Sequence, residues 1–231
     1  DGYSRKRLNV TADYRRDSTF GQVGFGVNVV NIERMRNVYI DQQIQRQNQF
    51  VGLYGELDYT LERIENIFTE PGDTGLQHYL DKFFDAWQNV VNNPSDLPAR
   101  TMVKTQAQVL CDTFHNLSGE LSDLRRSINT DLGARVDRVN ELAVEIYNMN
   151  QQIAEVEISN QNANDSRDNR DELVKELSKL IDVSVVENER GQISVSTAGS
   201  LLVSPVFYQE LETTTTSFQL PDGTSRTDIG I

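Results

Sequence analysis

Residues 110–156 decide the fold and read LCDTFHNLSGELSDLRRSINTDLGARVDRVNELAVEIYNMNQQIAEV. Their apolar side chains recur at steps of three and four residues, which is the spacing of one face of an α-helix. The steps follow a heptad repeat with one interruption near Gly133, and such a stutter locally unwinds a left-handed supercoil. A continuous helix from about residue 97 to 159 would be about 95 Å long, too long for the interior of a compact globule. The seam comprises Leu110, Phe114, Leu117, Leu121, Leu124, Ile128, Leu132, Val136, Val139, Leu142, Ala143, Ile146, Met149, Ile153 and Val156.

Two further helices are predicted before this seam. Apolar residues recur at helical spacing from about Ile32 to Phe68, although residues 42–49 between them are almost entirely polar. Residues 70–75 break the pattern with one proline and two glycines. A second helix is predicted over residues 76–91, and its aromatic side chains lie at helical spacing, which is more typical of a core than of a ligand pocket. The aromatic residues expected in this core are Phe83, Phe84 and Trp87.

A fourth helix is predicted after the seam, because leucine and valine residues recur at helical spacing over residues 173–181. Asp165, Asp168 and Asp171 lie ahead of these residues. They lack the alternating oxygen ligands, the central glycine and the final glutamate of an EF-hand loop. We therefore expect helix capping rather than metal binding, with Asn164, Asp165 or Asp168 as the candidate cap and with acids of the first turn facing the positive end of the helix dipole.

The last part of the chain has the spacing of strands. After residue 182 the apolar positions alternate, and residues 188–191 separate two such runs as the turn of a hairpin would. Further strands are expected at residues 201–203 and 206–208, and a turn at residues 221–223.

The first 31 residues predict an extended segment. Gly21, Gly24 and Gly26 superficially resemble a phosphate-binding loop, but their order is G-x-x-G-x-G and no Walker lysine follows them. Glycines in such a pattern more often permit turn geometry, so we interpret this stretch as a loop.

These patterns together predict a mainly α protein with an added β part, in which an elongated bundle of long helices is followed by the start of a β-rich domain. We expect an extended or loop lead-in over residues 1–31, the long helical bundle over residues 32–182, and an incomplete β-rich domain over residues 183–231.

Composition argues against several classes of protein. The 231 residues contain 22 Lys and Arg against 35 Asp and Glu, which gives a formal net charge of −13. Residues 1–50 carry an excess of +3, so the remaining residues carry −16. A long acidic surface repels the phosphate backbone of DNA or RNA, so no nucleic-acid partner is predicted. No stretch approaches the roughly 18 apolar residues needed to cross a bilayer, so no membrane partner is predicted.

The residues that could carry catalysis are few. Cys111 is the single cysteine, which excludes a disulfide within the chain, and His78 and His115 are the two histidines. Cys111 and His115 lie four residues apart and could share one helix face, but the sequence offers no orienting group or oxyanion site for a nucleophile. We therefore predict no catalytic residue, no cofactor and no metal site. An enzyme that uses Cys111 and His115 stays open as an alternative hypothesis.

A set of short motifs resembles one protein family. Gly-Tyr-Ser-Arg occurs across flagellar rod and hook proteins, whereas the Phe-Phe-Asp-Ala-Trp run followed by Asn-Pro-Ser-Asp is more specific. In chain order the motifs are Gly2-Tyr3-Ser4-Arg5, Gly26-Val27, Ile32-Glu33-Arg34, Asp41-Gln42-Gln43, Leu80, Phe83-Phe84-Asp85-Ala86-Trp87, Asn93-Pro94-Ser95-Asp96, Arg100, Asn164-Asp165 and Arg170-Asp171-Glu172-Leu173. Over about residues 2 to 205, the sequence resembles the flagellar hook-associated protein 1 family of hook-filament junction proteins.

The resemblance implies a structural adaptor of the bacterial flagellum, needed for filament assembly and without an active site. It implies export through the flagellar type III channel, an extracellular location, and contacts with the hook protein and the second hook-filament junction protein. Family members begin with a helix ahead of Gly-Tyr-Ser-Arg and finish with a C-terminal helix, so we expect this chain to be a central fragment lacking both segments. Self-association into a ring is implied for the full-length protein, and export-chaperone binding for its C-terminal segment.

A second reading of the residues stays open. A heptad seam can also make dimers, so the chain could be a free-standing coiled-coil tether or a secreted interaction module.

Overall fold

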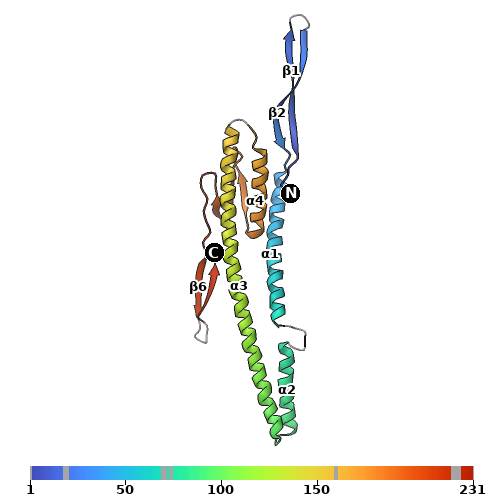
Figure 1. Ribbon diagram of the computed structural model, residues 1–231, viewed down its shortest axis with the longest axis vertical. Helices are drawn as coiled ribbons and strands as arrows, with labels where there is room; N and C mark the ends of the chain where they lie inside the picture. Colours follow the sequence, from blue (N-terminus) through green and yellow to red (C-terminus); the bar gives the residue numbers. More distant parts are fainter. Residues whose placement is uncertain are drawn as a thin grey trace. The chain divides into compact units, whose positions relative to one another are not determined.

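The computed structural model describes residues 2–17, 21–68, 72, 75–158, 161–219 and 225–230 (Figure 1). The chain is mainly α with smaller antiparallel sheets, which confirms the predicted fold class. Its helices are α1 Val38–Phe68, α2 Leu76–Asn92, α3 Leu97–Ile158 and α4 Asn164–Leu180. Its strands are β1 Lys6–Asp17, β2 Gly21–Arg34, β3 Ser184–Glu187, β4 Ile193–Thr197, β5 Ser200–Val203, β6 Thr214–Gln219 and β7 Ser225–Gly230.

The long helix predicted from the heptad seam is present as α3, which runs through Gly133 without a break and contains 62 residues. The β3–β4 hairpin is also confirmed, with Glu187 opposite Ile193 beside the predicted turn. Residues 206–208 do not form a strand, because only Tyr208 makes an isolated bridge, to Val203. The predicted breaks at residues 70–75 and 221–223 fall largely outside the described residues. Among the helices of the described ranges, none combines the length and the hydrophobicity that crossing a membrane requires.

Two compact units share the long helices. The first unit contains Asp1–Leu53, Ala134–Thr215 and Gly230–Ile231, and the second contains Tyr54–Gly133 and Thr216–Ile229. The boundary in α3 follows Gly133, the position at which the heptad repeat is interrupted. The chain therefore changes its packing partners where its apolar repeat changes phase.

The core of the first unit lies between the second part of α3, helix α4 and the β3–β4–β5 sheet. The predicted seam of α3 is buried here, because helix α4 and the β3–β4–β5 sheet cover it. Each large apolar side chain buried in this way stabilises the fold by about 1.5–3 kcal/mol. The buried cluster comprises Val139, Leu142, Ala143, Ile146, Val174, Leu177, Val183, Ile193, Val195, Leu202 and Val203.

Two asparagines of α3 tie the helix to the β-rich segment. The side-chain amide of Asn150 donates to the carbonyl oxygen of Ile193 (2.8 Å) and accepts from its backbone nitrogen (3.0 Å). Asn140 makes the same pair of bonds with Leu211, at 3.0 and 2.8 Å. Each asparagine amide thus supplies the donor and the acceptor that a neighbouring strand would supply. The backbone N–H and C=O groups of Ile193 and Leu211 are therefore paired.

The second unit covers its apolar side chains less completely. Leu124 is buried, but Phe114 and Ile128 of the same seam are exposed. Phe84 is 63% exposed and Trp87 is 48% exposed, so the predicted aromatic core on α2 is wrong for these two residues. Among the described residues of α2, the buried one is Ala86.

The first described segment is a long hairpin rather than a loop. Strands β1 and β2 pair antiparallel from Lys6 opposite Arg34 to Asp17 opposite Gly21. The predicted loop over the three glycines is therefore wrong, because these residues lie within β2. Gly26 has φ +101° beside an irregularity in the strand register, which is a conformation that glycine tolerates best.

Helix α1 lies close to the backbone of α4 at Gly52. A Cβ atom at this position would lie 2.0 Å from the carbonyl oxygen of Lys179, whereas a Cβ atom at Gly55 would meet no atom within 4 Å. The absence of a side chain at Gly52 is what permits this backbone contact.

We expect Gly52→Ala to lower the free energy of unfolding by about 1–3 kcal/mol, because the new methyl group would have to displace backbone. Gly55→Ala is the matched control on the same helix and should change stability by no more than about 1 kcal/mol, in the stabilising direction. Urea denaturation measures both. Equal stabilities of the two variants would contradict the close helix contact.

Candidate functional site

The described polar residues converge most densely at the start of α4, where five of them form a network that we call the clasp: Ser4, Arg34, Arg36, Asp168 and Asp171. Arg34 pairs with Asp168 (2.6 Å) and with Asp171 (2.5 Å), and its Nε donates to the hydroxyl oxygen of Ser4 (3.2 Å). The Ser4 hydroxyl in turn donates to Asp168 (2.9 Å). Arg36 pairs with Asp171. The clasp therefore joins the first residues, the end of β2 and helix α4.

Helical spacing explains why α4 can receive these partners. Asp165, Asp168 and Asp171 are three residues apart and so share one face of the helix. This face meets the base of the β1–β2 hairpin, where Lys6 pairs with Asp165 and where the amides of Asn162 and Asn164 donate to Ile32, at 2.9 and 2.7 Å. None of the predicted candidates Asn164, Asp165 and Asp168 is the N-cap of α4, so that expectation is wrong, whereas the predicted acid in the first turn is present as Asp165. The N-cap residue is Ala163, without a side-chain cap bond, because the carboxylates face the cations instead.

Arg170 lies under the clasp, and its side chain, with 1% exposed, is the most completely buried cation among the described residues. Its guanidinium donates to the carbonyl oxygen of Gly191 (2.5 Å) and to Asn150 (3.4 Å), and it lies 3.6 Å from Asp171. Its Nε has no hydrogen-bond partner among the described residues. Burial away from water lowers the pKa of Arg170 to about 10, and the attraction of Glu187 only partly opposes this shift. Arg170 therefore remains charged at neutral pH.

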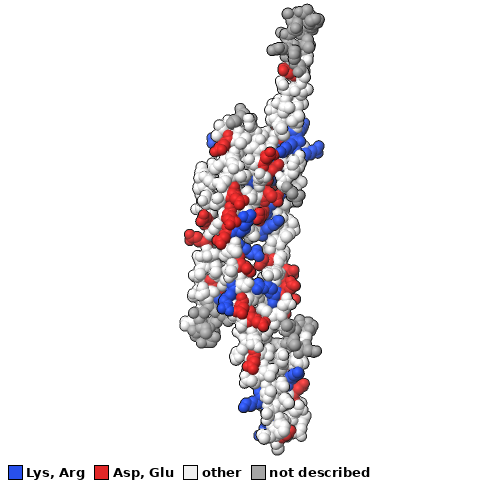
Figure 2. Space-filling view, in the orientation of Figure 1, with Lys and Arg blue, Asp and Glu red and all other residues white. Residues whose placement is uncertain are grey.

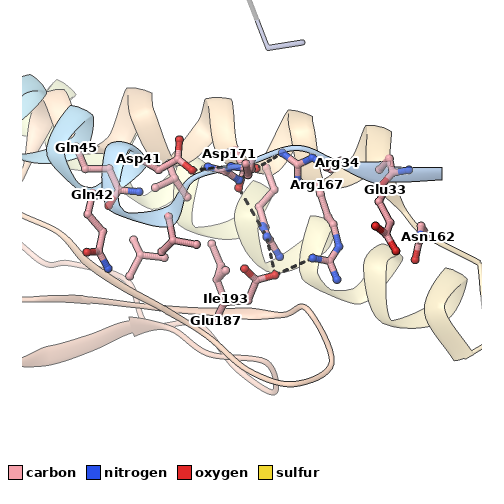
Figure 3. Close-up of a pocket in the computed structure, with 16 residues that line it drawn as sticks. Glu33, Arg34, Asp41, Gln42, Gln45, Asn162, Arg167, Asp171, Glu187 and Ile193 are labelled. Atoms are coloured by element: carbon pink, nitrogen blue, oxygen red, sulfur yellow. Dashed lines mark hydrogen bonds and ion pairs between the residues drawn. The ribbon is translucent and has the colours of Figure 1, made fainter. Parts of the chain in front are cut away.

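Gly191 is required at the turn that Arg170 contacts. Its φ is +71°, and a Cβ atom there would lie 1.8 Å from the guanidinium of Arg167. Arg167 bridges Glu157 (2.7 Å) on α3 and Glu187 (2.8 Å) on β3. A dashed line in Figure 3 marks the ion pair between Arg167 and Glu187. The turn is therefore fixed by its backbone shape and by charge together.

A cavity of about 360 Å³ lies beside these groups (Figure 3). Four arginines and four carboxylate residues line it, so their formal charges cancel and the lining favours neither an anion nor a cation. Within the described part of the chain, no group of three or more His, Cys, Asp and Glu residues could hold a metal ion. The charged groups around this cavity chiefly hold the end of β2, helix α4 and strand β3 in place relative to one another. The charged lining residues are Glu33, Arg34, Arg36, Asp41, Arg167, Arg170, Asp171 and Glu187.

The motif residues fall into two groups. Ser4 and Asp171 belong to the clasp, and Gly2, Tyr3, Arg5, Asp165 and Arg170 lie beside it. The carbonyl oxygen of Arg5 accepts from the backbone nitrogen of Met35 (2.8 Å). The second group lies in the second unit. Phe83 packs edge to face on Phe84 and Trp87, and Asn93 and Pro94 form the α2–α3 turn, where Arg100 donates to the carbonyl oxygen of Pro94 (3.0 Å).

Sequence reasoning missed several residues of this site. Arg36, Asn150, Arg167, Glu157 and Glu187 belong to no recognisable motif. The spacing of the aspartates on α4 was the available signal for the clasp, because a face with three like charges needs cations opposite it. Nothing in the sequence specifies which arginines supply them.

Comparison with known proteins gives a consistent result. Residues 61–230 match the family model described as "Flagellar hook-associated protein FlgK helical domain". The chain is 32% identical over 205 residues to flagellar hook-associated protein 1 of Bacillus subtilis, covering 86% of this chain and 40% of that protein. It is 29% identical over 200 residues to the Salmonella typhimurium protein of the same name, covering 85% of this chain and 36% of that protein. The chain thus spans about two fifths of the length of these relatives.

A solved structure agrees with the sequence matches. The flagellar hook junction protein FlgK from Burkholderia pseudomallei superposes with a TM-score of 0.60 at 25% identity, over 82% of this chain and 33% of that one.

We expect Asp168→Ala to lower the free energy of unfolding by about 1.5–3 kcal/mol, because Arg34, whose side chain is 9% exposed, and Ser4 both lose a charged partner. Asp165→Ala is the matched control on the same face, and its pair with Lys6 is exposed, so urea denaturation should show no measurable change. Hydrogen exchange of the β1–β2 amides should accelerate only in Asp168→Ala. Equal losses in the two variants would contradict a stabilising clasp.

Proposed function

Because the chain belongs to the FlgK helical-domain family of flagellar hook-associated proteins, we propose that it is a structural part of the junction between the flagellar hook and the filament, and not an enzyme. The family match over residues 61–230 carries this proposal. The printed title of the Burkholderia protein, a flagellar hook junction protein, supports the same role.

The internal construction suits a part that must keep its shape under load. Helix α3 is continuous over 62 residues, and a continuous helix is stiff because its backbone hydrogen bonds run along its axis. Polar networks with fixed partners hold the first segment, the β1–β2 hairpin and α4 together. Such networks specify one arrangement of the segments they join.

The partners in this proposal follow from the family. The protein would contact the hook protein and the second hook-filament junction protein, and copies of it would associate into a ring. It would leave the cell through the flagellar export channel, with a chaperone binding a C-terminal segment of the full-length protein, and would act outside the cell. The net charge of −13 supports neither a nucleic-acid nor a membrane partner.

We expect deletion of the gene encoding this chain in the source bacterium to leave hooks without filaments, with monomeric flagellin lost into the medium. Electron microscopy and an assay for flagellin in the medium measure the two effects, and complementation with the intact gene should reverse both. Normal filaments in the deletion strain would overturn the proposed function.

One observation favours a second candidate function, that of a coiled-coil tether or secreted interaction module. Phe114 and Ile128 of the heptad seam are exposed, and an exposed seam can be buried by pairing with a second copy.

Light scattering of the purified chain separates the two candidates. For a part of the junction we expect the mass of one chain at micromolar concentration. A stable dimer that dissociates on Phe114→Ser would favour the tether, with His115→Ser, an exposed neighbour in the sequence, as the control.

A further inference from the structure

Helix α3 is continuous, but its two parts differ in composition on either side of Gly133. Residues 97–133 contain seven Ser and Thr residues and two glycines, whereas residues 134–158 contain no Ser, Thr or Gly. These three residue types favour a helix less than alanine, leucine and glutamate do. The boundary between the two compact units also follows Gly133. The change in composition therefore coincides with the change of unit.

Five of the seven hydroxyl groups donate to the helix backbone one turn earlier. Each bond runs to the carbonyl oxygen four residues back, at 2.8–3.1 Å. In an α-helix the same oxygen accepts the N–H group of the donating residue, so the hydroxyl and the amide share one acceptor. Such hydroxyl bonds slightly destabilise a helix and bend it. They join Thr101 to Leu97, Thr105 to Thr101, Thr113 to Val109, Ser122 to Ser118 and Thr130 to Arg126.

The positions of these bonds give the bend a direction. Successive residues of a helix lie about 100° apart around its axis. On this count Thr101, Thr105 and Thr130 lie about 145–175° from the centre of the apolar seam of residues 110–132. A helix curves convex on the side where its carbonyl groups tilt outward and their hydrogen bonds lengthen. Residues 97–133 therefore favour a curve that has the seam on its concave side.

Residues 134–158 are built in the opposite way. Asn140 and Asn150 bond this part of α3 to the β-rich segment, and Arg138 pairs with Glu176 of α4 (2.8 Å). Figure 2 shows acidic and basic side chains gathered together over α4. The buried cluster of the first unit packs on the same part of α3. Because a close-packed interior has low compressibility, bending here would break these contacts.

We propose that α3 has two mechanical parts: residues 97–133 bend, and residues 134–158 stay fixed on the core of the first unit. The property belongs to α3 itself, so it goes beyond the proposed function and would hold for this chain without it. Within the proposed junction, a bending load on α3 would be taken up by residues 97–133, while the clasp keeps its geometry.

Distances between paired spin labels test this proposal. In a Cys111→Ala background, labels at Lys104→Cys and Asp131→Cys span the first part, about 40 Å at 1.5 Å per residue. Labels at Asp137→Cys and Glu155→Cys lie in the second part. All four side chains are exposed in this chain, so the labels should leave the fold intact, which circular dichroism checks. Pulsed electron spin resonance then gives the distribution of each distance.

Valine and serine variants separate the effect of the hydroxyl groups from that of side-chain shape. Thr105→Val, Thr113→Val and Thr130→Val together remove three hydroxyls but keep the branched shape and a similar helix propensity. We expect the Lys104–Asp131 distribution to become about 1.5-fold narrower and its mean to lengthen, with the Asp137–Glu155 distribution unchanged. The matched control is Thr→Ser at the same three positions, which keeps the hydroxyls and should leave both distributions as they are.

A glycine variant and amide exchange give independent readings. A Cβ atom at Gly119 would meet no atom within 4 Å, so Gly119→Ala should narrow the Lys104–Asp131 distribution without a clash. Exchange of the amides at residues 105, 113 and 130, corrected for intrinsic rates, should slow about threefold in the valine variant and not in the serine variant.

An unchanged Lys104–Asp131 distribution in the valine variant, or equal narrowing in the serine variant, would overturn the proposal. So would an Asp137–Glu155 distribution that is as broad, per residue spanned, as the Lys104–Asp131 distribution. None of these results bears on the junction role, which gene deletion tests separately.

Discussion

The charge pairing between Arg34 and the two carboxylates Asp168 and Asp171 is the interaction on which the first unit depends. It joins segments more than 130 residues apart in the sequence, and it lies where water has little access. Burying these charges costs free energy, and that cost is recovered only when every partner is in place. The pairing therefore favours one arrangement of the hairpin on α4, since an arrangement that separated these groups would leave buried charges without partners.

Arg170 shows the limit of this strategy. Its charge is fully buried, its Nε has no hydrogen-bond partner among the described residues, and its pKa is lowered by loss of water. The fold tolerates this because Arg170 holds the Gly191 carbonyl at the turn between β3 and β4. The sheet is thus positioned on α3 and α4 from two sides, by Asn150 at Ile193 and by Arg170 at Gly191.

Local patterns were enough to predict the four helices and the β3–β4 hairpin, because apolar periodicity and turn residues act over a few residues. The predicted start of the first helix at Ile32 is wrong, since Ile32 lies in β2 and α1 begins at Val38. The same patterns predicted the burial of Val136 to Ile153 but not the exposure of Phe114 and Ile128 in the same repeat. Periodicity predicts which face of a helix is apolar, but it does not predict how many neighbouring elements cover that face. The aspartates of α4 were misassigned as caps for a related reason: a carboxylate near a helix start satisfies both interpretations until the position of Arg34 is known.

The distribution of polar and apolar groups departs from the usual pattern of a globular protein around α4, on the β1–β2 hairpin and on α1, although the core between α3, α4 and the β3–β4–β5 sheet is apolar. Specific charge pairs lie inside, around α4, while valines and leucines of the hairpin and of α1 lie outside. A monomer selected only for stability would bury those apolar side chains first, since they supply most of the free energy of folding. Leaving them exposed makes sense when the shape is set by the inner polar network and the outer apolar faces are kept for contacts between molecules. The clasp thus fixes the orientation of the hairpin although the apolar face of the hairpin is uncovered in this chain.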